Sequence, residues 1–281
     1  MVDFRGYLTD ITGSTAHLSI MARDRMQKQR FELKYLITEE NALMVRDFVR
    51  SYLDFDEYSV GKPNYSYPVH SLYLDSDDLQ LYWETINGNK NRYKLRLRYY
   101  STHADAPVFF EIKRRLNNCI MKQRGGVRQD AVGMLLKGQL PQMDHLVSKS
   151  PNHLSALQNF CHLSNTILAK PKVHIFYMRE AYVSDDDQVR VTLDRNVWGE
   201  ANLDYTITTE TREPAICFPN QVILELKFTN RFPDWFRELV RVFGVMQCGA
   251  AKYCETVQGI GFRKLHSIYP ALEEPVRFAP S

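Results

Sequence analysis

The chain has 281 residues, a formal net charge of +3, 44% hydrophobic residues and 25% charged residues. These fractions are close to those of ordinary globular proteins, so wholesale disorder, a collagen repeat and a long coiled coil are excluded. No stretch reaches the roughly 18 apolar residues that a membrane-spanning helix needs. The five cysteines include no C-x-x-C pair. We therefore predict reduced thiols in a cytoplasmic protein, without a disulfide framework or a zinc site.

The predicted elements begin after an N-terminal segment without sustained periodicity. Residues 1–28 are interpreted as a tail or an over-long start, residues 29–265 as one α+β domain, and residues 266–281 as an irregular tail. The first element is a strand at 30–37, in which polar and apolar residues alternate. A helix at 39–53 follows it, with a threonine N-cap and acidic residues in the first turn.

The rest of the domain is predicted to be rich in strands. In chain order, the elements are a strand at 70–74, a helix that is capped by Asp75 or Ser76 and ends near Glu84, strands at 93–100, 108–115 and 119–124, helices at 131–137 and 153–169, strands at 172–184, 188–197 and 221–228, and a helix at 234–243. The three strands between residues 93 and 124 are joined by turn-length gaps, which predicts an antiparallel meander.

The polar faces of these strands are charged and mostly basic. Because side chains alternate along a strand, residues i, i+2 and i+4 share one face. The charged faces carry Arg30, Glu32 and Lys34; Lys94, Arg96 and Arg98; Glu111, Lys113 and Arg115; Lys122 and Arg124; Arg190 and Asp194; and Glu225 and Lys227. The opposite faces are apolar and need a cover of helices. Helices outside and charges inside predict a closed or strongly curved barrel with a basic lumen.

The alternative interpretation is a sheet with one solvated face, which is the common cause of such alternation. A solvated face normally mixes both signs of charge with neutral polar residues, whereas these faces repeat lysine and arginine. Like charges on neighbouring strands repel, so stacking them costs stability unless an anion lies between them. We therefore favour a lumen that binds a polyphosphorylated ligand. The glutamates among the lysines could form salt bridges or hold Mg²⁺ or Mn²⁺ against phosphate oxygens.

Short motifs along the chain match a known family in their order. They are Phe31-Glu32-Leu33-Lys34-Tyr35, Tyr73-Leu74-Asp75, Lys94-Leu95-Arg96-Leu97-Arg98, Phe110-Glu111-Ile112-Lys113, Lys122-Gln123-Arg124, Tyr177-Met178-Arg179, Arg190-Val191-Thr192-Leu193-Asp194, Leu224-Glu225-Leu226-Lys227 and Ala251-Lys252-Tyr253. This series resembles the VTC domain, the polyphosphate polymerase domain of the vacuolar transporter chaperone complex, within the triphosphate tunnel metalloenzymes of the CYTH-like superfamily. The resemblance implies an eight-stranded antiparallel β-tunnel with helices packed outside.

The resemblance also implies a reaction and a set of residues. The family reaction moves the γ-phosphate of ATP onto a growing chain of inorganic polyphosphate, with Mn²⁺ or Mg²⁺. The implied phosphate cradle consists of Lys34, Arg96, Arg98, Lys113, Lys122, Arg179, Arg190, Lys227 and Lys252. Further predicted substrate-binding residues are Lys94, Arg124, Glu32 and Glu111, and the implied metal ligand is Glu225.

One departure from the family pattern bears on the chemistry. Hydrolytic tunnel enzymes typically begin with Glu-x-Glu-x-Lys, and here Arg30 stands in the place of the first glutamate. Fewer acids are then available to hold metals that activate water, which favours transfer over hydrolysis. The alternatives are a tunnel triphosphatase and a non-catalytic module that binds polyphosphate or nucleotide. Nucleic acid is not an expected partner, since an enclosed tunnel excludes a duplex; whether a membrane protein is a partner is left open.

Overall fold

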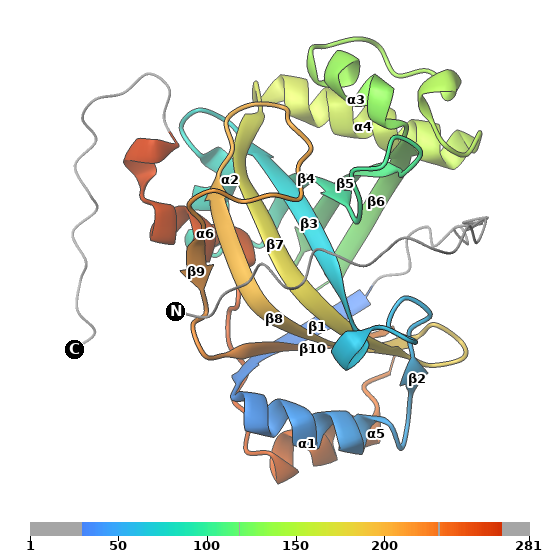
Figure 1. The fold of residues 1–281 in the computed structure, drawn as a ribbon, viewed down its shortest axis with the longest axis vertical. Coiled ribbons are helices and arrows are strands. Elements are labelled where there is room, and N and C mark those ends of the chain that lie inside the picture. Colours follow the sequence, from blue (N-terminus) through green and yellow to red (C-terminus); the bar gives the residue numbers. More distant parts are fainter. Residues whose placement is uncertain (1–29, 118, 230, 266–281) are drawn as a thin grey trace.

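Eight antiparallel strands close into a barrel at the centre of the fold (Figure 1). The computed structural model describes residues 30–117, 119–229 and 231–265, so the predicted tails at 1–28 and 266–281 lie outside the described residues. The hydrogen-bonded order is β7-β3-β4-β5-β6-β1-β10-β8, and pairing of β8 with β7 closes the ring. The predicted closed antiparallel tunnel is confirmed.

The barrel strands agree with the predicted segments, and most are longer. They are β1 (Arg30–Ile37), β3 (Ser66–Asp75), β4 (Asn91–Tyr99), β5 (Val108–Leu116), β6 (Cys119–Val127), β7 (Lys170–Val183), β8 (Val189–Ala201) and β10 (Val222–Thr229). Two short strands that were not predicted extend the sheet outside the ring: β2 (Asp54–Phe55) pairs with β7, and β9 (Ala215–Cys217) pairs with β8.

Helices cover the apolar outer faces of the strands. They are α1 (Glu39–Val49), α2 (Gln80–Ile86), α3 (Gln129–Leu136), α4 (Pro151–Thr166), α5 (Asp234–Val242) and α6 (Lys252–Ile260), with 3₁₀ turns at Pro63–Tyr65, Met143–His145 and Phe262–Lys264. In Figure 1, α3 and α4 lie together at one end of the molecule, and α1 and α5 lie at the other. Among the described residues, no helix has the length and apolar character needed to cross a membrane.

Two outer cores follow from this arrangement. Beside β1, β8 and β10, the buried core contains Val45 and Val49 of α1 with Leu224 of β10 and Phe236 of α5. A separate core joins β4, β5 and β6 to α3 and α4, and Phe160 of α4 is completely buried there. Because the apolar residues of each strand are used on the outside, its charged residues face the lumen.

A third core differs because it includes luminal positions at one end of the barrel. Tyr73 and Ile223, which alternate with the apolar outward residues of β3 and β10, pack with Tyr253 and Val257 of α6. The last helix thus fills part of this barrel end with apolar side chains. It also places Lys252, its first residue, beside the luminal carboxylates.

Asp75 and Ser76 cap the second helix with their side chains as predicted, but the helix begins later than expected. Asp75 is the last residue of β3, and its carboxylate accepts hydrogen bonds from the backbone N–H groups of Leu81 and Tyr82, at 2.9 and 3.0 Å. The Ser76 hydroxyl accepts from the N–H of Gln80 at 2.9 Å. Both residues therefore satisfy the free N–H groups of α2 from outside the helix, which begins only at Gln80.

Candidate functional site: a charged lumen

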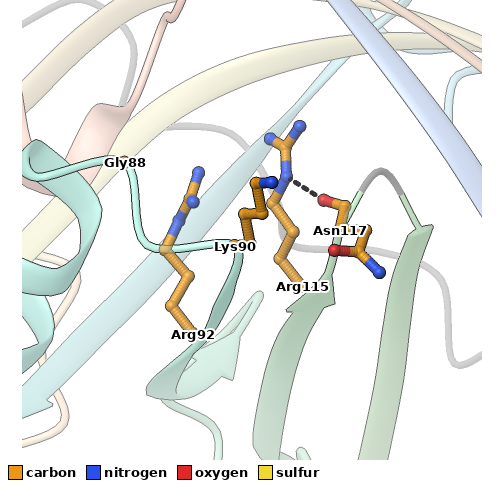
Figure 2. Close-up of a pocket in the computed structure, with 5 residues that line it drawn as sticks. All are labelled: Gly88, Lys90, Arg92, Arg115 and Asn117. Carbon is orange, nitrogen blue, oxygen red and sulfur yellow. Dashed lines mark hydrogen bonds between the residues drawn. The ribbon is translucent and has the colours of Figure 1, made fainter.

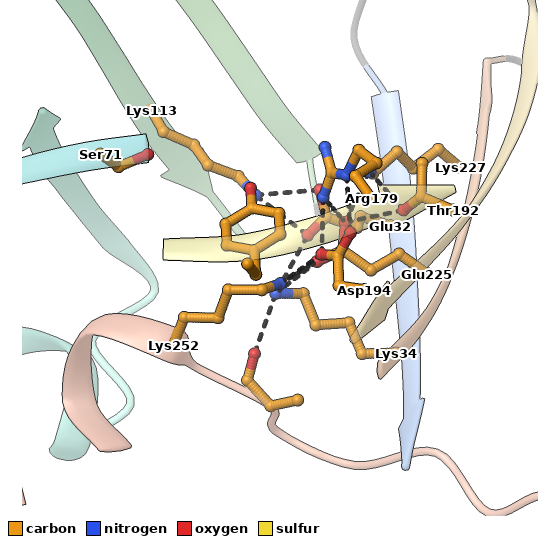
Figure 3. Close-up of polar contacts among 12 residues, drawn as sticks. Glu32, Lys34, Ser71, Lys113, Arg179, Thr192, Asp194, Glu225, Lys227 and Lys252 are labelled. Atoms are coloured by element: carbon orange, nitrogen blue, oxygen red, sulfur yellow. Dashed lines mark hydrogen bonds and ion pairs between the residues drawn. The ribbon is translucent and has the colours of Figure 1, made fainter. Parts of the chain in front are cut away.

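The luminal side chains of several strands converge on a small group of carboxylates (Figure 3). Figure 3 shows these side chains coming from β1, β5, β7, β8, β10 and the first turn of α6. Most of the charged groups are buried, so each interaction acts in a medium of low dielectric constant and is stronger than it would be in water.

Glu225 is the centre of this group. Its carboxylate lies 2.5 Å from Lys227, 3.2 Å from Lys34, 3.3 Å from Lys252 and 3.4 Å from Arg179. Burial alone would raise the pKa of Glu225, but these four cations outweigh burial and hold its pKa well below the usual value. The predicted metal ligand is therefore ionised and already surrounded by positive charge.

Asp194 on β8 is a second buried carboxylate in the lumen. The Arg179 guanidinium donates to both of its oxygens, at 2.6 and 2.7 Å, and Lys252 lies 2.6 Å away. Asp194 was not among the predicted site residues, although it shares a face with Arg190 in the period-two pattern. Asp194 could have been predicted as a luminal residue from this period-two pattern.

The other two luminal glutamates also pair with basic residues. Glu111 is completely buried and lies 2.7 Å from Arg96 and 2.5 Å from Lys122. Glu32 lies 2.9 Å from Lys113, and although burial opposes it, the nearby lysines keep the pKa of Glu32 well below the usual value. Of the two roles considered for the glutamates, the structure displays the salt bridge.

Two cations in the lumen are not compensated in this way. The Arg98 guanidinium donates to the Ser71 hydroxyl at 3.3 Å and to the Tyr177 hydroxyl at 2.8 Å, and the residue is 5% exposed. Lys94 lies 5.7 Å from the centroid of the Tyr253 ring. Among the described residues, neither cation has a carboxylate at ion-pair distance.

The register of the strands places further like charges directly opposite one another. Lys94 of β4 is directly opposite Lys113 of β5, which in turn is opposite Lys122 of β6. Burial lowers the pKa of all three lysines, although Glu32 partly offsets this effect at Lys113 and Glu111 partly offsets it at Lys122. A row of lysines of this kind is stabilised by a bound anion.

Two tyrosines contribute to the lumen and were not predicted as site residues. The Tyr73 hydroxyl accepts a hydrogen bond from Arg96 at 3.0 Å. Burial would raise the pKa of Tyr73, but Arg96, Arg98 and Lys94 outweigh burial and lower its pKa to about 7. The Tyr177 hydroxyl accepts a hydrogen bond from Arg98 at 2.8 Å, since tyrosine combines an apolar ring with a polar end.

Two predicted residues have partners other than the luminal carboxylates. Arg190, near the start of β8, pairs with Asp56 at 2.7 Å. The Arg124 guanidinium stacks over the Phe109 ring, 4.7 Å from its centroid. The structure therefore brings most of the predicted cradle together, while Arg190 is held by an acid that the sequence patterns did not indicate.

The luminal carboxylates are also candidate metal ligands. Within the described ranges, no group of three or more His, Cys, Asp and Glu side chains is arranged to hold a metal ion. Mg²⁺ and Mn²⁺ at phosphates, however, commonly use only one or two protein carboxylates, and substrate oxygens and water supply the remaining ligands. Glu225 fits that more limited role, provided that bound phosphates attract some of its cationic neighbours.

The family model described as the VTC domain matches residues 29–260. This chain belongs to the VTC domain family. This chain is 24% identical over 247 residues to the vacuolar transporter chaperone complex subunit 4 of Schizosaccharomyces pombe. That alignment covers 74% of this chain and 34% of the yeast subunit, so the chain spans about a third of the length of this relative.

Solved structures of similar topology come from bacteria and archaea. A candidate adenylate cyclase from Bacillus halodurans is 14% identical, with a TM-score of 0.44 over 80% of the VTC domain chain and 94% of the bacterial chain. The PH1819 protein of Pyrococcus horikoshii is 13% identical, with a TM-score of 0.41 over 82% of this chain and 98% of the archaeal chain.

Proposed function

We propose that this VTC domain is an ATP-dependent polyphosphate polymerase, which transfers the γ-phosphate of ATP to the end of a polyphosphate chain inside the barrel. The observation that carries the proposal is the pair of luminal cations, buried Arg98 and half-buried Lys94, that have no carboxylate at ion-pair distance among the described residues. A buried cation without a carboxylate at ion-pair distance is costly, and its place beside the lysine row of the lumen is best explained by a polyanionic ligand.

The proposed transfer needs little covalent chemistry from the protein. An anionic oxygen at the end of the chain attacks the γ-phosphorus of ATP, the bond from that phosphorus to the β–γ bridging oxygen breaks, and ADP leaves with the electron pair. The acceptor oxygen is already ionised, so no side chain has to remove a proton. The lysines and arginines of the lumen hold the two anions in line and neutralise the charge that develops between them.

The same barrel is suited to a divalent cation held mainly by phosphate oxygens. Glu225 would supply its protein ligand, with Glu32 and Asp194 close enough to influence the charge of the site. When bound, Mn²⁺ or Mg²⁺ would neutralise charge on the transferred phosphoryl group.

Arg30 supports transfer over hydrolysis. It stands where hydrolytic relatives of this fold carry an additional glutamate, and its guanidinium donates to the backbone carbonyl of Asp187 at 3.3 Å. A cation at this position favours a polyanionic acceptor and offers no ligand to a metal that would activate water.

The decisive experiment incubates the purified protein with Mn²⁺ and ATP labelled on the γ-phosphate, then separates chains from free phosphate. The proposal expects label in long chains and, in a parallel reaction with α-labelled ATP, label only in nucleotide. Free phosphate alone would identify a triphosphatase instead. Tight binding of tripolyphosphate without either product would identify a non-catalytic binding module.

A further inference from the structure

A second cluster of basic residues lies where β4 begins and β5 ends. Lys90, Arg92 and Arg115 line a cavity of about 390 Å³ together with Gly88 and Asn117. Figure 2 shows the three charged side chains extending side by side in one direction. We call Lys90, Arg92 and Arg115 the mouth cluster.

The backbone fixes the positions of the mouth cluster. Arg92 is directly opposite Arg115 in the β4–β5 register. The N–H of Asn117 donates to the carbonyl of Lys90 at 2.9 Å, and the Arg115 Nε donates to the carbonyl of Asn117 at 2.8 Å. The Arg92 guanidinium donates to the carbonyl of Asn89. These contacts hold the side chains near one another without neutralising them.

The charge of the mouth cluster is only weakly compensated within the ranges that the structure describes, since Glu84 acts on Arg92 from beyond ion-pair distance. No salt bridge to Lys90, Arg92 or Arg115 is found there, and the two arginines face each other across the strands. Partial burial, and then the charge of Arg115, lowers the pKa of Arg92. Opposed like charges are unfavourable by themselves and become favourable when an anion binds between them.

The mouth cluster continues the lumen instead of forming a separate surface. Arg92 shares its face of β4 with Lys94 and Arg96, and the opposed pair Lys94–Lys113 comes next after Arg92–Arg115. At about 3.3 Å per residue, Arg92 lies roughly 13 Å along β4 from Arg96. A short anion held at Arg96 and Arg98 leaves the mouth cluster free, whereas a longer chain of phosphates can reach both.

We propose that the mouth cluster is a second anion subsite, which binds the part of a polyphosphate chain that extends beyond the lumen. This inference rests on the proposed function, because it assigns a chain-length preference to the same barrel. The shared row of basic residues from Arg92 to Arg98 guides the chain along β4. The subsite makes a long chain bind more tightly than tripolyphosphate.

The test compares two ligands and two variants by isothermal titration. The double variant Arg92→Gln/Arg115→Gln removes the opposed pair, and Arg114→Gln is the matched control. Arg114 is on the same strand but on the opposite face, where its guanidinium lies 5.9 Å from the centroid of the Tyr93 ring. We expect the double variant to lose about tenfold or more in affinity for long-chain polyphosphate and to keep its affinity for tripolyphosphate within about twofold. The control should keep both affinities.

Equal loss of affinity for the two ligands, or no loss for either, would overturn the mouth subsite. A thermal melt accompanies each titration, and the double variant should melt at the wild-type temperature or above it because a like-charge pair is removed. A clear fall in melting temperature would mean that the arginines stabilise the fold, and it would count against the proposal. Failure of the wild-type protein to bind tripolyphosphate would instead overturn the proposed function, so the two failures are distinguishable.

Discussion

Replacing Arg98 by glutamine removes a buried positive charge that has no carboxylate partner in the described part of the chain. In a polyphosphate-binding lumen, the lost charge-assisted contacts are worth roughly 1.5–3 kcal/mol, which corresponds to about a 10- to 150-fold weaker affinity. The cost to stability should be small. Glutamine can keep part of the contact with Ser71 and Tyr177, and the variant relieves the repulsion between Arg98 and Arg96.

The matched control is Arg195→Gln on the outer side of the same barrel. Arg195 is also buried, at 6% exposed, but it pairs with Glu180 at 2.7 Å and with Glu39 at 2.9 Å. Removing Arg195 takes away two ion-pair contacts of a buried guanidinium and leaves Glu180 paired with Arg46 at 2.7 Å, which lowers the stability of the fold. We therefore expect the control to lose stability and to keep its affinity for tripolyphosphate.

Isothermal titration against tripolyphosphate, together with thermal melts of the unliganded proteins, separates the two effects. Arg98→Gln should bind more weakly and melt within a few degrees of the wild type, whereas Arg195→Gln should show the reverse. An unchanged affinity in Arg98→Gln, combined with a large fall in melting temperature, would refute the reasoning. The luminal cations would then be part of the structural framework.

Three further predictions address other parts of the barrel. Glu225→Gln should abolish chain synthesis and lower the melting temperature, because the cationic neighbours of Glu225 lose their counter-charge. Added tripolyphosphate should raise the melting temperature of this variant more than that of the wild type, and an equal rise would count against this account. Burial lowers the pKa of Lys227 to about 7, and Tyr73, whose pKa is also about 7, gains negative charge over the same pH range. Affinity for tripolyphosphate should therefore fall above about pH 7, by up to about tenfold per pH unit for each of these two groups. An affinity that does not change with pH would exclude both groups from the binding site. Gly199→Ala should lower the melting temperature because the new Cβ would lie 2.3 Å from Thr256 Cγ2. Adding Thr256→Ala should restore much of the lost stability, and a failure to restore it would mean that this contact is not the cause of the loss.

The regular parts of the fold could be predicted because their sequence periods are strong. The meander of β4, β5 and β6 was anticipated almost in full, since charged and apolar residues alternate along each strand and the connections are short. The helix α6 was missed. It is short, and its apolar residues pack into the barrel end, so they do not form the long stripe that marks a helix on an outer surface.

The charged part of the lumen was easier to predict than its neutral part. Repeated lysine and arginine on one face of a strand is unusual, whereas Ser71, Tyr73 and Tyr177 are ordinary residues for a strand. Their hydroxyl groups become important only because β3 and β7 place them beside Arg96 and Arg98. Such contacts depend on which strands become neighbours, and a single strand does not contain that information.

The register of β4 against β5 decides which cations are available to a ligand. The inward faces are Arg92, Lys94, Arg96 and Arg98 on β4, and Glu111, Lys113 and Arg115 on β5. The inward face of β5 contributes a single acid, Glu111. Any register that keeps most of both faces inward therefore places basic residues of β4 opposite basic residues of β5. That conclusion follows from the sequence alone. The observed register adds that Glu111 compensates Arg96, so Lys94 and Arg98 remain for an anion and Arg92 and Arg115 meet at the barrel mouth. A shift by two residues towards Arg98 would set Glu111 opposite Arg98 instead, and the uncompensated charge would lie at different positions along the tunnel.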